Sequence, residues 1–275
     1  MSTESVNQAT QMISEVSTAE MLALINDEDK KVPSIVEKCI PQIAILVEKG
    51  AEAIKNGFRV IYCGAGTSGR LAIADAAECP PTYGLSPECF TGVIAGGKEA
   101  VFRAAEGCED SRERGVEAFV ESKCQSGDLV IGISASGQAP FVCAFMEEAK
   151  KIGCTVGAIV NNPNCPMDKI AHVVVMAETG AEAIKGSTRM KAGTSQKLIL
   201  NMFSTAVCIK LGCVYKNYMV NMQVSNSKLK RRAIAMVCEI TSLAASDAES
   251  LLDAHGWVVR DALEDYFTKT APREE

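Results

Sequence analysis

The chain has 275 residues, of which 47% are hydrophobic and 23% charged, and its formal net charge at pH 7 is −6. This length is sufficient to bury a core, as one large domain or as a main domain with a small appendage. The acidic balance excludes a chain-wide basic surface that would attract nucleic acid or an anionic membrane, so we expect neither as a partner. An anionic ligand must then be held by local geometry.

The first predicted elements are helices. Residues 17–20 (Ser-Thr-Ala-Glu) form a capping-box pattern and predict a short helix through Leu24, which the polar residues 26–29 would end. Residues 32–56 carry apolar side chains at helical spacing and predict one longer amphipathic helix before the first strand.

From residue 59 onward, short apolar segments rich in β-forming residues alternate with helical segments. The predicted strands cover residues 59–63, 90–95, 129–134, 155–160 and 172–176. Continuous apolar strands that alternate with helices are typical of a parallel sheet covered on both faces. The predicted fold class is therefore α/β, a three-layer sandwich with a parallel sheet flanked by helices.

The last part of the chain changes character. Residues 186–194 form a loop rich in hydroxyl and basic groups, which precedes a buried helix predicted over residues 195–211. From residue 226 the sequence predicts short helices, with a turn at residues 255–256. We expect a main domain over residues 1–225, including the N-terminal helices, and a small C-terminal helical appendage over residues 226–275.

The twelve cysteines stand singly in hydrophobic segments, and no Cys-x-x-Cys pair occurs. With only two histidines, His172 and His255, this pattern argues against a structural zinc site and favours free, buried thiols in a reducing compartment. The polar N-terminal residues lack a signal-peptide core, and no uncharged segment is typical of a membrane span. We predict a cytoplasmic protein without a metal site.

Two predicted strands run into similar loops, Gly-Ala-Gly-Thr-Ser-Gly at 64–69 and Ser-Ala-Ser-Gly at 134–137. The carboxyl ends of parallel strands lie at one edge of the sheet, where open α/β folds bind ligands. The first loop matches the dinucleotide fingerprint, but the second strand ends in Gly96-Gly97 without the acid that such sites use.

Backbone N–H groups and hydroxyls at a helix start suit a phosphate monoester, and the loop at 186–194 adds more hydroxyls and a lysine. The alternative is that each loop is a tight glycine turn with a serine N-cap. We predict phosphate binding by these loops. The candidate residues are Gly66, Thr67, Ser68, Ser134, Ser136, Gly137, Ser187, Thr188 and Lys191.

Two glutamates are candidates for acid–base chemistry. Glu78 lies about ten residues into the helix after the first loop, before Pro80-Pro81, which we expect to end that helix. Glu109 lies in the segment Glu-Gly-Cys-Glu-Asp at 106–110. From the residues alone, Glu78 could instead be a solvated glutamate of the last turn, and Glu109 a helix cap.

Eight segments carry a resemblance to a known family. They are residues 17–21, 25–29, 64–71, 78–84, 94–97, 106–110, 186–194 and 226–229. In these segments the sequence resembles the N-acetylmuramic acid 6-phosphate etherases, members of the sugar-isomerase (SIS) domain superfamily, over about residues 5–233. The glucokinase regulatory proteins are similar but larger, with two such domains.

The resemblance implies a SIS-like fold and a reaction. The D-lactyl ether at C3 of N-acetylmuramic acid 6-phosphate is cleaved by elimination and hydration, giving N-acetylglucosamine 6-phosphate and D-lactate. No metal or redox cofactor is needed. Glu78 matches the general acid of the family and Glu109 its second catalytic glutamate. The implied role is N-acetylmuramate catabolism or peptidoglycan recycling.

The resemblance also implies a homodimer with sites at the subunit interface. A straight helix of ten residues is about 15 Å long, which exceeds a single sugar phosphate. We therefore expect Glu78 to meet the phosphate loop of the partner subunit, or the helix to bend or end early.

Two other functions remain open, a sugar-phosphate isomerase and a non-catalytic sugar-phosphate sensor. The presence of both Glu78 and Glu109 argues against the sensor, because binding alone requires only the phosphate loops. Release of lactate separates the etherase from the isomerase.

Overall fold

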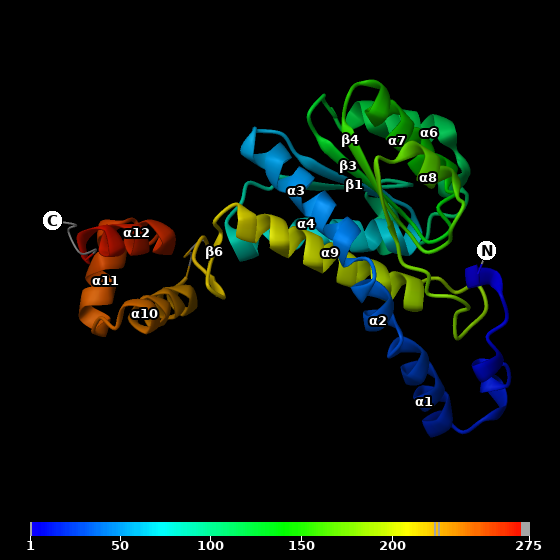
Figure 1. Cartoon of the computed structure of the whole chain (residues 1–275), viewed down its shortest axis with the longest axis horizontal. Helices are drawn as coiled ribbons and strands as arrows, with labels where there is room; N and C mark the ends of the chain where they lie inside the picture. Colours follow the sequence, from blue (N-terminus) through cyan, green and yellow to red (C-terminus); the bar gives the residue numbers. More distant parts are fainter. Residues whose placement is uncertain (1, 223, 225, 271–275) are drawn as a thin grey trace. The chain divides into compact units, whose positions relative to one another are not determined.

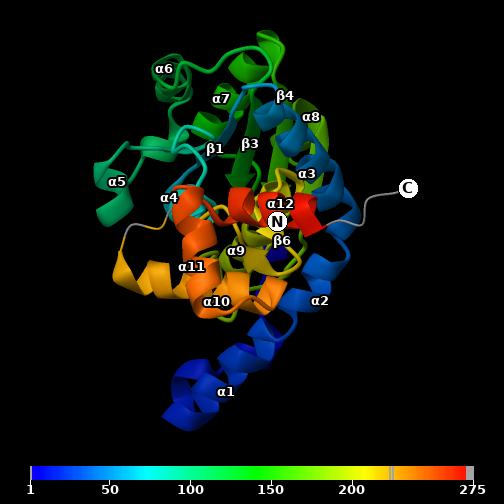
Figure 2. The same ribbon diagram turned by 90° about the vertical axis from the view of Figure 1, so that its left-hand side faces the viewer.

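The computed structural model describes residues 2–222, 224 and 226–270. The chain divides into two compact units. Unit 1 comprises Met1–Ala77 and Pro87–Val207, and unit 2 comprises Glu78–Ser86 and Cys208–Glu275. Figures 1 and 2 show the elements in two perpendicular views.

Unit 1 begins with short 3₁₀ helices at Ser2–Glu4, Gln8–Thr10 and Ile13–Glu15, followed by α1 (Thr18–Asp29), α2 (Val32–Glu37) and α3 (Ile40–Lys55). The predicted capping box is confirmed, because the Ser17 side chain accepts from Glu20 N and the Glu20 side chain accepts from Ser17 N.

Two predictions about these helices were wrong. Helix α1 continues through the polar residues 26–29, since Glu28 is buried there against a lysine rather than solvated. The single helix predicted over 32–56 is two helices. Pro41 lacks an N–H and fits the first turn of a helix, so a new helix begins at Ile40.

The predicted sheet is confirmed. Its strands are β1 (Val60–Gly64), β2 (Phe90–Ile94), β3 (Leu129–Ser134), β4 (Thr155–Val160) and β5 (Val173–Met176). All neighbouring strands pair in parallel, in the order β2-β1-β3-β4-β5. β1 and β3 are buried along their whole length, as expected for strands covered on both faces.

Helices cover both faces of the sheet and give the predicted three layers. On one face lie α3, α4 (Gly66–Tyr83) and α9 (Lys191–Lys210), where the rings of Tyr62 and Phe203 meet edge to face with centroids 6.1 Å apart. On the other lie α6 (Arg112–Glu121), α7 (Pro140–Lys151) and α8 (Pro166–Ile170), whose Met146 and Met167 reach the backbone of Gly132. Figure 2 shows α6 and α7 on one side of β1 and β3, and α3 on the other. The short helix α5 (Glu99–Phe102) follows β2.

Helix α4 continues past the C-terminal end predicted for it. It begins at Gly66 and continues through Pro80 and Pro81 to Tyr83, so the prolines do not end it. Each proline removes one N–H donor, but its fixed φ of about −65° is compatible with a helix. The last turn closes by a hydrogen bond from Gly84 N to Pro80 O at 2.8 Å.

Unit 2 has its own apolar core. It contains a short antiparallel pair, β6 (Val214–Tyr215) and β7 (Tyr218–Met219), and three helices, α10 (Ser227–Thr241), α11 (Ala245–Ala254) and α12 (Val259–Thr270). The predicted turn is present, with His255 ending α11 and Gly256 at a φ of +58°. Asn221 Nδ2 donates to Tyr83 O at 2.7 Å and so ties residues 78–86 to the rest of this unit.

All twelve cysteines are free thiols, nine of them buried. Within the described residues, no helix is both long and apolar enough to cross a membrane. Over the same residues, no group of three or more His, Cys, Asp or Glu side chains is placed to hold a metal ion.

Candidate functional site

The two Gly/Ser loops leave neighbouring strands of the sheet. β1 and β3 pair in register, with Gly64 opposite Ile133, so both strands end at the same level. After β1 the chain returns to β2 on one side, and after β3 it goes to β4 on the other. This reversal is the topological switch point at which open α/β sheets bind ligands.

The first loop is built on close backbone packing. A Cβ atom on Gly64 would lie 2.7 Å from the backbone N of Gly69, so only glycine fits there. Gly66 has a φ of +52°, which a residue with a side chain rarely adopts. Ser68 is buried in the first turn of α4. The first N–H groups of a helix have no intrahelical partner and suit an anion.

The second loop is a serine-stabilised turn. Gly137 N donates to Ser134 Oγ at 3.1 Å, and Gln138 N donates to Ser136 Oγ at 3.2 Å. The two serine hydroxyls lie 3.3 Å apart. Both hydroxyls accept from the backbone, and their protons remain to donate to each other or to a ligand.

The third loop lies beside the first. α9 begins at Lys191 rather than at the predicted residue 195, because the Glu182 carboxylate caps it, accepting from Lys191 N and Ala192 N at 2.9 Å each. Burial raises the pKa of Glu182, and these N–H donors offset only part of that effect. A Cβ atom on Gly193 would lie 3.4 Å from Thr67 Cγ2, so the first turn of α9 packs on the first loop.

Ser187 and Thr188 lie in the turn that precedes this helix, and both are partly exposed. Lys191 is buried, and its ammonium pairs with Glu28 of α1 at 2.5 Å. Burial alone would raise the pKa of Glu28, but hydrogen bonds from Lys191 and Lys31 lower it below the ordinary value. A phosphate contact by Lys191 would therefore be shared with Glu28, and this role stays a prediction.

The two candidate glutamates lie in different units. Glu78 is exposed on α4 and belongs to unit 2. Glu109 is exposed and lies in the 3₁₀ helix Cys108–Asp110 of unit 1. This helix directly follows Gly107, which has a φ of +72°. Each is open to solvent within its own unit, and their pairing at one substrate stays a prediction.

Sequence reasoning missed the buried polar residues behind the loops. Glu182, Gln196 and Asn161 are all at most 1% exposed and bind loop or helix-start groups. Among the described residues, Thr179 Oγ1, in the segment after β5, is a buried side-chain atom without a hydrogen-bond partner. A single sequence does not reveal that an Asn or Gln such as Asn161 or Gln196 faces a loop, because its partners lie far away in the chain.

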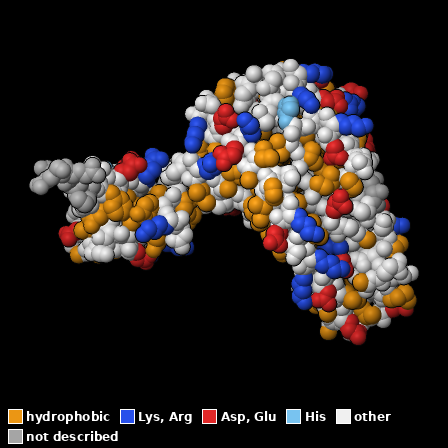
Figure 3. Space-filling view, viewed as in Figure 1, with side chains coloured by type: hydrophobic (Ala, Val, Ile, Leu, Met, Phe, Trp, Pro, Cys, Tyr) orange, Lys and Arg blue, Asp and Glu red, His pale blue; other side chains and the backbone are white. Residues whose placement is uncertain are grey.

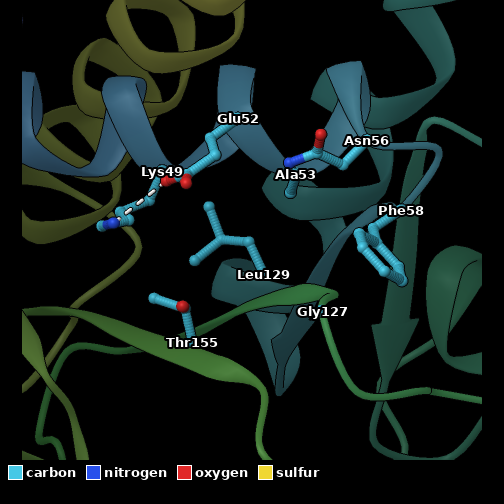
Figure 4. A pocket seen from close by; sticks show the side chains of 8 residues that line it. All are labelled: Lys49, Glu52, Ala53, Asn56, Phe58, Gly127, Leu129 and Thr155. Carbon is cyan, nitrogen blue, oxygen red and sulfur yellow. Dashed lines mark hydrogen bonds and ion pairs between the residues drawn. The ribbon is translucent and has the colours of Figure 1, made fainter.

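A pocket of roughly 210 Å³ lies at the opposite, amino-terminal edge of the strands. Figure 4 shows the residues that line it, from α3 and from the starts of β3 and β4. They are Lys49, Glu52, Ala53, Asn56, Phe58, Gly127, Leu129 and Thr155. Lys49 and Glu52 form an ion pair of 3.0 Å. This lining contains none of the predicted site residues.

The partly buried carboxyl group of Asp75, three residues before Glu78 in the sequence, holds α4 in place. Tyr62 Oη of β1 donates to one oxygen of Asp75 at 2.9 Å, and Ser204 Oγ of α9 donates to the other at 3.0 Å. Burial raises the pKa of Asp75 to about 6, although the two hydroxyl donors act in the opposite direction.

Asp75 gives a prediction for the pH dependence of stability. The pKa of Asp75 in the folded protein lies above the unfolded value of 3.8, so its stabilising contribution is fully present below pH 3.8 and is lost as the pH rises through 6. Because Asp75→Asn cannot titrate, the free energy of unfolding of the wild type relative to this variant should fall by up to about 3 kcal/mol between pH 4 and 7. Urea unfolding of both proteins across this range measures the difference, and a constant difference would contradict the prediction.

A family model of the glucokinase regulatory protein N-terminal SIS domain matches residues 42–150, and one of the C-terminal lid domain of the same protein matches residues 216–267. The chain is 49% identical over 261 residues to the N-acetylmuramic acid 6-phosphate etherase of Symbiobacterium thermophilum, covering 95% of this chain and 87% of that protein. It is 47% identical over 263 residues to the protein of the same name from Clostridium beijerinckii, covering 96% and 86%.

Among solved structures, the phosphoheptose isomerase from Neisseria gonorrhoeae matches with a TM-score of 0.55. The match covers 70% of this chain and 99% of that one, at 17% sequence identity. At this identity the match shows a common fold and no more.

Proposed function

The chain belongs to the N-acetylmuramic acid 6-phosphate etherases, and from this we infer which residues bind the phosphate and which transfer protons. The protein cleaves the lactyl ether of N-acetylmuramic acid 6-phosphate and is a carbon–oxygen lyase. Identity over nearly the whole of both chains carries this conclusion. The SIS-type fold adds two Gly/Ser loops at the switch point, where a phosphate group would bind.

We propose that the phosphate binds where the three loops meet, at the ends of β1 and β3 and the start of α9. The residues proposed to contact it are those predicted from the sequence. The close packing of Gly193 on Thr67 supports this placement, because it brings the third loop to the first. An anion here would face the N-terminal ends of α4 and α9.

We propose that Glu109 removes the C2 proton and that Glu78 protonates the leaving oxygen. Opening of the sugar ring exposes the C1 aldehyde, which acidifies the C2–H bond. The C2–H electrons form the C2=C3 bond as the C3–O bond breaks and lactate leaves with the proton from Glu78. Water then adds to C3, and a proton returns to C2. Each proton transfer by a positioned carboxyl group contributes about 10²–10⁴-fold.

A homodimer with shared sites is part of the proposal. Ile40 and Ile45 of α3 and Met202 of α9 are between 42% and 49% exposed, although these helices pack on each other through Gly50 and Phe203. Figure 3 shows apolar side chains gathered over this face. An apolar face of this kind suits a second copy of the chain.

We also propose the division of labour along the chain and the setting of the reaction. Residues 1–225 would form the catalytic domain and residues 226–275 an accessory helical appendage. The twelve free cysteines favour a reducing compartment, so the proposed setting is the cytoplasm, in N-acetylmuramate catabolism or peptidoglycan recycling.

Pure protein incubated with N-acetylmuramic acid 6-phosphate should release D-lactate and N-acetylglucosamine 6-phosphate in equal amounts. In H₂¹⁸O the label should enter the C3 hydroxyl of the sugar and not lactate, because water adds after the C3–O bond breaks. A coupled D-lactate assay and mass spectrometry of both products measure this. N-acetylmuramic acid without phosphate is the control and should react far more slowly. Formation of a ketose without lactate would instead identify an isomerase.

A further inference from the structure

Four buried polar side chains form one hydrogen-bonded chain behind the first loop. It runs from Ser68 at the start of α4 to Gln196 of α9, then to Asn161 directly after β4, and on to Ser195 of α9. Ser68 Oγ lies 2.8 Å from Gln196 Oε1, and Gln196 Nε2 lies 3.0 Å from Asn161 Oδ1. Asn161 Nδ2 lies 2.8 Å from Ser195 Oγ. All four residues are at most 7% exposed.

The direction of this chain is fixed by a backbone carbonyl group. Asn161 Nδ2 donates to Ala177 O at 2.7 Å, and a carbonyl oxygen can only accept, so the amide nitrogen of Asn161 must face that side. Its oxygen therefore faces Gln196, which must present its own nitrogen in return. The oxygen of Gln196 is left to face Ser68. Because that oxygen can only accept, the Ser68 hydroxyl has to be the donor.

The far end of the chain agrees with this direction. Ser195 Oγ donates to Ala192 O at 2.7 Å, so its single proton is used and it can only accept from Asn161. Every hydrogen bond therefore donates in the direction from Ser68 toward Ser195, and the last donors end on the backbone oxygens of Ala177 and Ala192. No alternative amide orientation satisfies both carbonyl groups.

This direction changes the role expected for Ser68. A phosphate oxygen is an acceptor, and the one hydroxyl proton of Ser68 is already donated to Gln196. We propose that Gln196 and Asn161 are positioning residues for sugar-phosphate binding. They hold Ser68 by its hydroxyl, so that the loop offers a phosphate the backbone N–H groups of residues 66–68. This proposal rests on the proposed function, since it takes the first loop as the phosphate site.

The hydrogen-bonded chain also connects the first loop to the rest of the fold. It joins the start of α4, the end of β4 and the start of α9. Ser68 and Gln196 are 128 residues apart in the sequence, and Gln196 and Asn161 are 35 apart. Removal of Gln196 would leave a buried amide oxygen of Asn161 unpaired and free the Ser68 hydroxyl, both of which are costly in a dry interior.

Gln196→Leu tests the proposal. We expect the KM for N-acetylmuramic acid 6-phosphate and the dissociation constant of N-acetylglucosamine 6-phosphate each to rise about tenfold, equivalent to one lost buried hydrogen bond. The kcat should change by less than about threefold, because the chain does not contact the glutamates. Affinity for N-acetylglucosamine, which lacks the phosphate, should not change. Ser204→Ala, another buried polar residue of α9, is the matched control and should keep wild-type affinity.

The double variant separates positioning from direct binding. If Ser68 acts through Gln196, then Ser68→Ala combined with Gln196→Leu should weaken binding no more than the stronger single change. If the Ser68 hydroxyl instead donates to the phosphate, Ser68→Ala should weaken binding far more than Gln196→Leu. That second result would overturn the proposal.

Gln196→Glu provides a test that does not depend on whether the fold accepts a leucine at position 196. A protonated carboxyl group reproduces the amide, with its O–H toward Asn161 and its carbonyl toward Ser68. Burial raises the pKa of the introduced group, so the ratio of variant to wild-type KM should be near one at about pH 5.5 and rise toward tenfold at about pH 8. A ratio that does not vary with pH would contradict the fixed direction of the chain.

Failure of the two proposals can be told apart. Wild-type protein that releases lactate while Gln196→Leu, folded by circular dichroism, keeps wild-type KM would overturn the positioning proposal alone. Wild-type protein that neither releases lactate nor binds a sugar 6-phosphate would remove the proposed function, and the positioning proposal with it.

Discussion

Glu109→Gln should lower the rate of lactate release from N-acetylmuramic acid 6-phosphate by about 10²–10⁴-fold. The amide keeps the size of the side chain but cannot accept the C2 proton. Because Glu109 is exposed on a short 3₁₀ helix, the stability of the protein should change by no more than about 0.5 kcal/mol. Initial rates of D-lactate formation at saturating substrate measure the effect, with thermal unfolding as the control for the fold.

Glu78→Gln should reduce lactate release to a similar extent, but the reaction should stop at a different step, the cleavage of the ether bond. With Glu109 intact, the C2 proton can still exchange with solvent although the ether bond does not break. In ²H₂O, Glu78→Gln should therefore incorporate deuterium at C2 of unreacted substrate, whereas Glu109→Gln should not. The reverse pattern would exchange the two roles, and wild-type rates in either variant would remove that residue from the mechanism.

Mixed dimers test whether the two glutamates of one site come from different subunits. If they do, a mixture of Glu78→Gln and Glu109→Gln chains, dissociated and reassembled at equal amounts, contains hybrid dimers with one intact site. Random pairing should then restore about a quarter of wild-type activity. Sites built within single subunits would give no recovery.

Gly84→Ala is expected to be the most destabilising single-methyl change in unit 2. Gly84 has a φ of +65°, and a Cβ atom there would lie 1.9 Å from the backbone oxygen of Asn221. Because a backbone oxygen cannot turn aside like a flexible side chain, the segment 78–86 has to separate from residue 221. Backbone strain and overpacking together should cost about 2–4 kcal/mol. Fluorescence of Trp257, the one tryptophan of the chain, reports urea unfolding of this unit.

Gly256→Ala is the matched control in the same unit. Gly256 has a φ of +58°, but a Cβ atom would meet nothing within 4 Å, so only the backbone strain of about 1–2 kcal/mol remains. Equal effects of the two substitutions would show that contact with Asn221 contributes nothing. Because Gly84 follows Glu78 by six residues, a loss of lactate release in Gly84→Ala at full folding would link this contact to the position of Glu78.

The five strands and their parallel pairing could be predicted from local sequence, whereas their order in the sheet was not predicted. The five strands are short apolar runs ended by glycine or polar residues, and that signal does not depend on distant contacts. Helix boundaries were less predictable where a distant residue decides them. α1 continues past its polar residues because Lys191, far along the chain, pairs with Glu28. α9 begins four residues earlier than predicted because Glu182 caps it.

Local sequence was enough to predict the succession of strands and helices along the chain, the two Gly/Ser loops and the family, because these depend on residues close together in the chain. Contacts between distant residues set which polar groups remain available to a ligand. The Ser68 hydroxyl and the Lys191 ammonium both look like phosphate donors in the sequence, yet Gln196 and Glu28 already occupy them. A buried donor binds the acceptor that folding places beside it, and local sequence does not contain that partner.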